Sequence, residues 1–352
     1  MSTDIGQVDL GAARHVVAES TQYFFSGWKP IFQGVDRAVG TADLAFGFAH
    51  PVCRKQNVNV VRVFLGDDRI RFLTTSSAPP IPYVNNNGRT ISRTISEFLS
   101  EEENAEVVLA VNANFSYYTG SDVSGKEFVL FGAAVRDETV VCDPALAPWT
   151  QDNAGCLPCN DQSKDGCDVP GPGYAGAAAL LIREGNRAEI VLATAADPVD
   201  LSDVHTAIAG SAQPARGSLC PQPQIVPLNR LLWNGHNQAT PQEIPEELVA
   251  GRTAVGLGVA EGVRYLYLMT LDGREGDAYP YGAGFYDLGE WMKIAGATDA
   301  IPLDGGGSSV MAWRAADGTL VHAGVPYGDE TTPGVERAVG NFFGVIAPRL
   351  GE

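Results

Sequence analysis

Hydrophobic and polar residues alternate along much of the chain with the period of two that β-strands require. Residues 58–65 and 69–73 alternate on either side of a Gly-Asp-Asp turn, and we expect them to form a β-hairpin. Residues 177–182 and 188–193 flank a Glu-Gly-Asn turn in the same way. Up to about residue 193, the pattern therefore predicts sheet rather than helix.

Further apolar runs extend this pattern towards the C-terminus. Predicted strands cover residues 106–111, 253–259, 265–270 and 300–303, and a last hairpin covers 309–313 and 319–323 with its turn at Asp317-Gly318. Hydroxyl residues before Glu97 signal a short helix, and a second helix is expected over 285–295. Because strands outnumber helices, the pattern predicts an α+β fold of strand-rich mixed sheets with a few helices packed against them.

The periodicity also suggests how the chain is organised. Residues 1–54 are only weakly periodic and are expected to be an irregular or strand-containing lead-in. Residues 55–348 are expected to form a single large catalytic domain, interrupted by a loop excursion at 142–176 that is rich in cysteine, proline and glycine.

Cysteine usage bears on the cellular compartment. Four of the six cysteines lie between Cys142 and Cys167, which favours disulfide bonds and a secreted, periplasmic or extracellular location. A zinc site on Cys156, Cys159 and Cys167 and free thiols are the alternatives. The first residues lack a basic stretch followed by an apolar one, so the sequence as given shows no signal peptide.

Composition excludes several classes of partner. A formal net charge of −18 argues against a nucleic-acid groove or an anionic membrane surface as the main partner. No apolar run approaches the ~18 residues of a membrane span, so we expect no membrane insertion. The five histidines show no metal-binding spacing, so no metal site and no required cofactor are predicted, while clustered Asp and Asn oxygens leave a structural Ca²⁺ open.

The strongest candidate for chemistry is the segment that begins at Asp304. It follows an apolar run and continues as Gly305, Gly306, Gly307 and Ser308. Glycines let backbone N–H groups approach a ligand closely, and a carboxylate beside them can bind a sugar hydroxyl or transfer a proton. The alternative is a tight glycine turn capped by the aspartate.

Five other residues are weaker candidates. Asn112 and Asn114 end a buried strand and could bind sugar hydroxyls, or they could satisfy only their own backbone. Arg252 and Arg337 could bind an anion, although surface ion pairs are the commoner role of arginine. Asp272 follows a predicted strand and could approach Asp304 if the two strands are neighbours, the alternative being an ordinary Asp-Gly turn.

Taken in order, these motifs resemble the phosphodiester glycosidase domain family, that of N-acetylglucosamine-1-phosphodiester α-N-acetylglucosaminidase. The resemblance covers roughly residues 55–348. It is carried by AVNANF at 110–115, HTAIAG at 205–210, GRTAVG at 251–256, LDGR at 271–274, GATDAIPLDGGGSS at 296–309, and the Glu-Arg pair at 336–337 with Asn341. Ala113 and Asn114 depart from the paired glycines of the family, which affects the expected sugar.

The resemblance implies a hydrolase that cleaves a sugar-1-phosphodiester and releases the sugar and a phosphomonoester. By motif, the site residues are Asn112, Arg252, Asp272, Asp304, Ser308 and Arg337. We hypothesise that the arginines bind the phosphodiester, that the glycine amides and Ser308 support an oxygen gaining charge, and that Asp304 and Asp272 share the proton transfers. The alternatives are a glycosidase acting on an ordinary glycosidic bond of a glycan, and a non-catalytic carbohydrate-binding protein.

Overall fold

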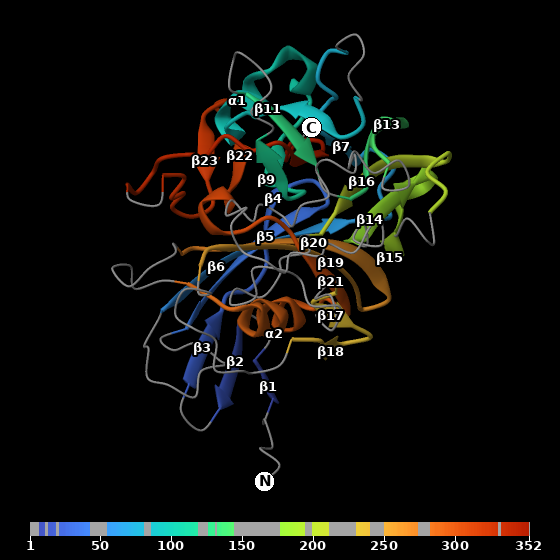
Figure 1. Cartoon of the computed structure of the whole chain (residues 1–352). Helices are drawn as coiled ribbons and strands as arrows, with labels where there is room; N and C mark the ends of the chain where they lie inside the picture. Colours follow the sequence, from blue (N-terminus) through green and yellow to red (C-terminus); the bar gives the residue numbers. More distant parts are fainter. Residues whose placement is uncertain are drawn as a thin grey trace, which may run out of the picture.

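The computed structural model describes residues 7–10, 13–18, 21–42, 55–80, 86–118, 126–130, 132–143, 177–193, 199–210, 230–239, 250–273, 282–329 and 332–351. Strands make up about half of this part of the chain, with two α-helices and three short 3₁₀ segments (Figure 1). The predicted α+β class is confirmed.

The largest sheet, called here the main sheet, carries the candidate site on three of its strands. Its order is β1-β2-β3-β5-β6-β20-β19-β21-β17-β18, with β4 beside β5. The strands are β1 (Gln7–Leu10), β2 (Ala13–Ala18), β3 (Thr21–Phe25), β4 (Lys29–Phe32), β5 (Val35–Ala42), β6 (Gln56–Phe64), β17 (Leu232–Trp233), β18 (His236–Asn237), β19 (Arg252–Ala260), β20 (Val263–Leu271) and β21 (Asp299–Pro302).

Three smaller sheets complete the described structure. The second sheet has the order β23 (Leu320–His322), β22 (Met311–Arg314), β9 (Leu109–Asn112), β24 (Phe342–Ile346) and β7 (Arg71–Thr74). The third has the order β13 (Thr139–Cys142), β12 (Ala134–Arg136), β16 (Val204–Ala209), β14 (Ala177–Arg183) and β15 (Arg187–Ala193). A three-stranded sheet consists of β10 (Ser116–Tyr118), β11 (Glu127–Leu130) and β8 (Arg89–Ile91).

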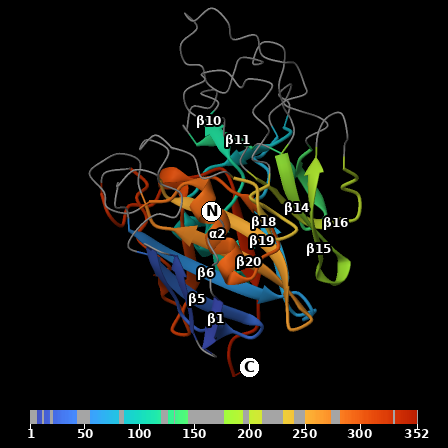
Figure 2. The same ribbon diagram turned by 90° about the horizontal axis from the view of Figure 1, so that it is seen from below.

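Both predicted helices are present. Helix α1 (Ile95–Ser100) starts with a capping box, in which the Thr94 side chain accepts from the Glu97 N–H and the Glu97 carboxylate accepts from the Thr94 N–H. Helix α2 (Phe285–Ala295) lies across one face of the main sheet (Figure 2). Its close approach requires glycine beneath it, since a Cβ on Gly40 would lie 2.6 Å from the Trp291 ring.

The opposite face of the main sheet covers the central core. Alternation in β6 and β20 sends Val61, Val63, Leu266 and Leu268 into a cluster shared with the second and third sheets. The intervening Val58, Val60 and Met269 face α2 instead. The main sheet therefore separates two apolar layers and is buried on both sides over its centre.

The hairpin predicted over residues 58–73 is wrong, although both of its strands exist. β6 pairs with β5 on one side and β20 on the other, so it has no free edge for β7. β7 crosses into the second sheet and pairs with β24. The other predicted hairpins, β14 with β15 and β22 with β23, are confirmed.

The lead-in and the cysteine-rich excursion differ in how far the structure describes them. Residues 7–42 form β1–β5, and β5 pairs with β6, so the main sheet continues across the predicted boundary at residue 54. Residues 144–176 lie outside the described part, as do the other five cysteines. Cys142 is a buried free thiol at the end of β13, and disulfide formation stays a prediction. Among the described helices, none is long and apolar enough to cross a membrane.

Candidate active site

Strand pairing brings the two candidate carboxylates to one edge of the main sheet. β19 lies between β20 and β21, with Arg252 opposite Leu271 and Ala254 opposite Pro302. Both neighbours therefore end beside the start of β19, where Asp272 follows β20 and Asp304 follows β21. With one strand between them, their backbones are separated by about two strand spacings, roughly 10 Å.

Gly251 is the point where the two loops meet. A Cβ at this position would lie 2.8 Å from the carbonyl oxygens of both Gly273 and Gly306. Only glycine fits such a contact. The loop after Asp272 and the loop after Asp304 are thus packed against the same residue, immediately before Arg252.

Asp304 is held from several directions. Its N–H donates to the Ala113 carbonyl at 3.0 Å, and its Oδ1 accepts from the Gly305 N–H at 2.9 Å. Burial raises the pKa of Asp304 to about 6, against the lowering effects of the Ser308 hydroxyl, the Gly305 N–H and the charges of Arg337 and Arg252. A carboxyl group with such a pKa can exchange a proton near neutral pH.

The two candidate arginines contact the glycine loop. Arg252 is 5% exposed, and its Nε donates to the Ala283 carbonyl at 3.1 Å while its guanidinium lies over the Phe285 ring. A Cβ on Gly305 would lie 3.2 Å from Arg252 Nη1, and one on Gly307 would lie 2.7 Å from Arg337 Nη2. Two guanidinium groups beside one buried carboxyl group form a setting suited to an anion.

The glycine loop is largely bonded to the protein itself. Gly306–Ser308 form a 3₁₀ turn, and Gly306 has the positive φ of 63° that favours glycine. The Gly305 N–H donates to Asp304 and the Gly306 N–H to the Gly251 carbonyl at 2.9 Å. These two amides therefore position the loop, and contact of Gly305, Gly306, Gly307 or Ser308 with a substrate stays a prediction.

Asn112 joins the two sheets beneath Asp304. Its side chain is 0% exposed, and its Nδ2 donates to the Asp304 carbonyl at 2.7 Å. Its Oδ1 accepts from the Thr253 hydroxyl at 2.8 Å and from the Val310 N–H at 3.1 Å. Three of its hydrogen-bonding positions are committed to the protein, so we assign Asn112 to holding Asp304 rather than to sugar binding.

Asn114 has a similar internal role. It is 1% exposed, and its Nδ2 donates to the Ala133 carbonyl at 3.1 Å. Its Oδ1 accepts from the Ala209 N–H at 3.0 Å and from Asn341 Nδ2 at 2.8 Å. The amide therefore ties the second and third sheets together, and sugar binding by Asn114 stays a prediction.

Asp272 is held by a residue that the sequence did not single out. Its Oδ2 accepts from Asn57 Nδ2 at 2.6 Å, and the Val325 N–H also donates to the carboxyl group. Burial raises the pKa of Asp272 to about 6, which these two hydrogen bonds oppose. The available signal was the pair of asparagines at 57 and 59, which occupy one face of a largely apolar strand.

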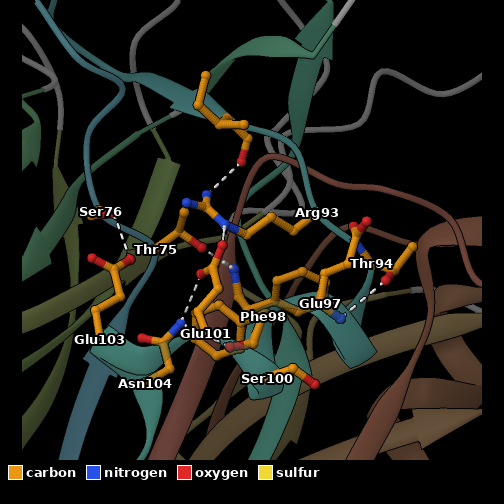
Figure 3. A network of polar contacts seen from close by, with 12 residues as sticks. Thr75, Ser76, Arg93, Thr94, Glu97, Phe98, Ser100, Glu101, Glu103 and Asn104 are labelled. Atoms are coloured by element: carbon orange, nitrogen blue, oxygen red, sulfur yellow. Dashed lines mark hydrogen bonds and ion pairs between the residues drawn. The ribbon is translucent and has the colours of Figure 1, made fainter.

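The segment carrying Arg337 is anchored to α1. Burial acts to raise the pKa of Glu336, but hydrogen bonds from His322 and Ser96 outweigh it and lower the pKa to about 2. Glu336 accepts from the Ser96 hydroxyl at 2.5 Å, and Val339 pairs with Arg93 through both backbone groups. Figure 3 shows Arg93 beside Glu101, with the capping pair of Thr94 and Glu97 at the start of the helix.

Within the described ranges, no group of three or more His, Cys, Asp or Glu side chains is arranged to hold a metal ion. The site that the structure does describe consists of two buried carboxyl groups, two arginines and the amides that support them. The predicted residues Asp304, Arg252, Arg337 and Ser308 are brought together, with Asp272 at the same sheet edge.

Comparisons with known proteins bear on the fold and the family of the chain. No curated protein matches the chain. The catalytic domain of zebrafish N-acetylglucosamine-1-phosphodiester α-N-acetylglucosaminidase, auto-inhibited by its pro-peptide, is similar in fold, with 16% identity, a TM-score of 0.52, and coverage of 91% of this chain and 85% of that one. A candidate exported protein of Burkholderia pseudomallei has 12% identity, a TM-score of 0.55, and coverage of 98% of this chain and 100% of that one. The family model for phosphodiester glycosidase matches residues 159–346, more than half of the sequence, and the chain therefore belongs to the phosphodiester glycosidase family.

Proposed function

We propose that the protein hydrolyses a sugar-1-phosphodiester. Water adds to the anomeric carbon, the bond from that carbon to the phosphate oxygen breaks, and the products are the free sugar and a phosphomonoester. The family supports a glycosidase of this type, and the residues at the edge of the main sheet supply the groups that the reaction needs.

The observation that carries the proposal is that Asp304 is followed by a glycine loop that two arginines contact. The Arg252 guanidinium lies beside Gly305 and that of Arg337 beside Gly307, and the charges of both act to lower the pKa of Asp304. Arginine forms bidentate hydrogen bonds with phosphate oxygens. A phosphodiester bound by the arginines would place its anomeric carbon beside a carboxyl group, as glycosidic cleavage requires.

The chemistry divides between the arginines and the carboxyl groups. A phosphomonoester is a weak base, so the leaving oxygen needs little protonation once the arginines neutralise its charge. The greater demand is to stabilise an oxocarbenium-like anomeric carbon and to take a proton from the attacking water. Asp304 and Asp272 share these two tasks in the proposal, and no cofactor takes part in it.

The test is a substrate comparison with a matched variant. We expect the purified protein to hydrolyse UDP-N-acetylglucosamine or another sugar phosphodiester, with both products detected, and to leave neutral aryl glycosides intact. Asp304→Asn should lower kcat by at least about 100-fold while circular dichroism stays unchanged, because general acid–base groups contribute on that order.

Three results would contradict the proposal. Full turnover by Asp304→Asn would show that the reaction does not need the Asp304 carboxyl group. Sugar binding without any turnover would favour a non-catalytic carbohydrate-binding protein. Loss of activity in EDTA, with rescue by one ion, would show that a metal is required.

We also propose that the protein acts in an oxidising compartment outside the cytoplasm. The crowding of Cys156, Cys159 and Cys167 supports this location, as does the similarity in fold to a candidate exported protein. Peptide mapping without reduction should find cystine-linked peptides among the cysteines other than Cys142. Six free thiols in protein prepared under oxidising conditions would contradict it.

A further inference from the structure

Two buried nitrogen atoms behind Asp272 lack hydrogen-bond acceptors. They are Arg37 Nε on β5 and Asn59 Nδ2 on β6, and they belong to a small set of such atoms in the described part of the chain. Asn59 is 2% exposed. Native proteins seldom leave buried donors unpaired, and such atoms call for a structural or catalytic explanation.

The orientation of the Asn59 amide is fixed by Arg37. Arg37 Nη2 donates to Asn59 Oδ1 at 2.8 Å, so the oxygen of the amide faces the guanidinium and the nitrogen faces away from it. The guanidinium itself lies 5.0 Å from the centre of the Trp313 ring. Arg37 therefore decides which end of the Asn59 amide points away from β5.

The amide nitrogen lies near Asp272. A Cβ added to Gly324 would overlap Asp272 Oδ1 and would lie 3.1 Å from Asn59 Nδ2, so both atoms surround the same point. Strand geometry agrees, because Asn57, which already bonds Asp272, is two residues from Asn59 and on the same face of β6.

We propose that Asn59 is a positioning residue for Asp272, donating from Nδ2 to the ionised carboxylate, and that Arg37 holds the amide in the orientation this requires. The link to catalysis rests on the proposed function, whereas the pairing itself does not. A protonated Asp272 needs few donors, and Asn57 and Val325 already supply two. The ionised form can use a third, which makes Asn59 a donor for the charged state.

The electrostatic consequence has a definite sign. A hydrogen bond to the charged form of a carboxyl group lowers its pKa, so Asn59 should oppose the effect of burial on Asp272. Within this network the charged group contributed by β5 is Arg37. The other charged groups at the same sheet edge are Asp304, Arg252 and Arg337, and the variants below leave them in place.

The experiment titrates Asp272 directly and without substrate. Protein with ¹³C-carboxyl aspartate is titrated by NMR, and the Asp272 signal is identified by its loss in Asp272→Asn. Asn59→Leu should raise the pKa of Asp272 by about one unit, the scale expected for a hydrogen bond to a charged group. Arg37→Met should raise it in the same direction, because the amide is then free to turn.

Arg62→Met is the matched control. Arg62 lies on β6 but on the opposite face, where it pairs with Asp36 and contacts Trp28 and Tyr265. It should leave the pKa of Asp272 unchanged. If Asn59→Leu does not fold, Asn59→Ala decides the question, since it removes the same donor and keeps the charge of Arg37 in place.

Kinetics provide the second readout. The limb of the kcat–pH profile that follows Asp272 should shift in Asn59→Leu by the same amount as the pKa, with KM within about twofold. In an Asp272→Asn background the change at Asn59 should have no further effect, because the two residues act as one unit. An unchanged Asp272 pKa in the Asn59 variant would overturn the inference, whatever the effect of Arg37→Met, which also removes a positive charge. Absence of any turnover would refute the proposed function, and the titration would still decide the pairing.

Discussion

Substitution of Asn112 distinguishes between a positioning role and a sugar-binding role for this residue. Asn112→Ala removes three buried hydrogen bonds, to the Asp304 carbonyl, the Thr253 hydroxyl and the Val310 N–H. Each contributes about 1 kcal/mol net, and a buried partner left unpaired adds roughly 1–3 kcal/mol. Because the site is fully buried, we expect a total loss of about 3–5 kcal/mol in the free energy of unfolding.

The assay is urea unfolding followed by tryptophan fluorescence, with kinetics on the same samples. Asn112→Asp is the comparison, because it keeps an oxygen for Thr253 and Val310 but places a second oxygen against the Asp304 carbonyl. Both variants should lower kcat more than they raise KM, since the Asp304 loop loses its anchor. A destabilisation below about 1 kcal/mol together with a large rise in KM would refute this reasoning and restore direct sugar binding.

Three further predictions concern single contacts. Gly324→Ala should lower kcat strongly, because its Cβ would overlap Asp272 Oδ1, and steady-state kinetics with a thermal-unfolding control would check this. Burial raises the pKa of Asp272 and of Asp304 to about 6, so the folded state binds their protons more tightly than the unfolded chain. That stabilisation is complete below about pH 4 and is lost as pH rises through about 6. The free energy of unfolding of the parent protein, compared with that of Asp272→Asn or Asp304→Asn, should therefore fall by up to about 3 kcal/mol per carboxyl group between pH 4 and 7. Burial raises the pKa of the Cys142 thiol to about 12, and mass-spectrometric mapping should find it unmodified by iodoacetamide at pH 8 until the protein is unfolded.

Local signals in the sequence were sufficient for both helices and for ten of the 24 described strands. The capping pair of Thr94 and Glu97 placed the start of α1, and the turn at Asp317-Gly318 placed the last hairpin. Strand pairing was less accessible, because β6 and β7 are adjacent in sequence yet belong to different sheets. Alternation reports which face of a strand is buried and does not report its neighbour.

The same limit applies to the candidate site. Asp304 and its glycines stand out because an acidic residue before three glycines is unusual after an apolar strand. Asn57 and Asn59 are unusual on an apolar strand, but their relation and that of Arg37 to Asp272 cannot be inferred from the sequence, because it depends on the registers of β5, β6 and β20. Such registers are set by the packing of whole sheets, to which distant residues contribute.

The position of the site explains why its carboxyl groups are desolvated and yet fixed. Asp304 and Asp272 follow strands of the main sheet at the seam where the second sheet packs against it, and Asn112 and Val325 reach them from the second-sheet side. Burial at this seam raises both pKa values towards neutrality, while fixed amide donors limit the rise. A more exposed site would lose the shift, and one without these hydrogen bonds would have higher carboxyl pKa values. The seam between the sheets therefore does more than join them, because it sets the protonation of the groups proposed to carry the reaction.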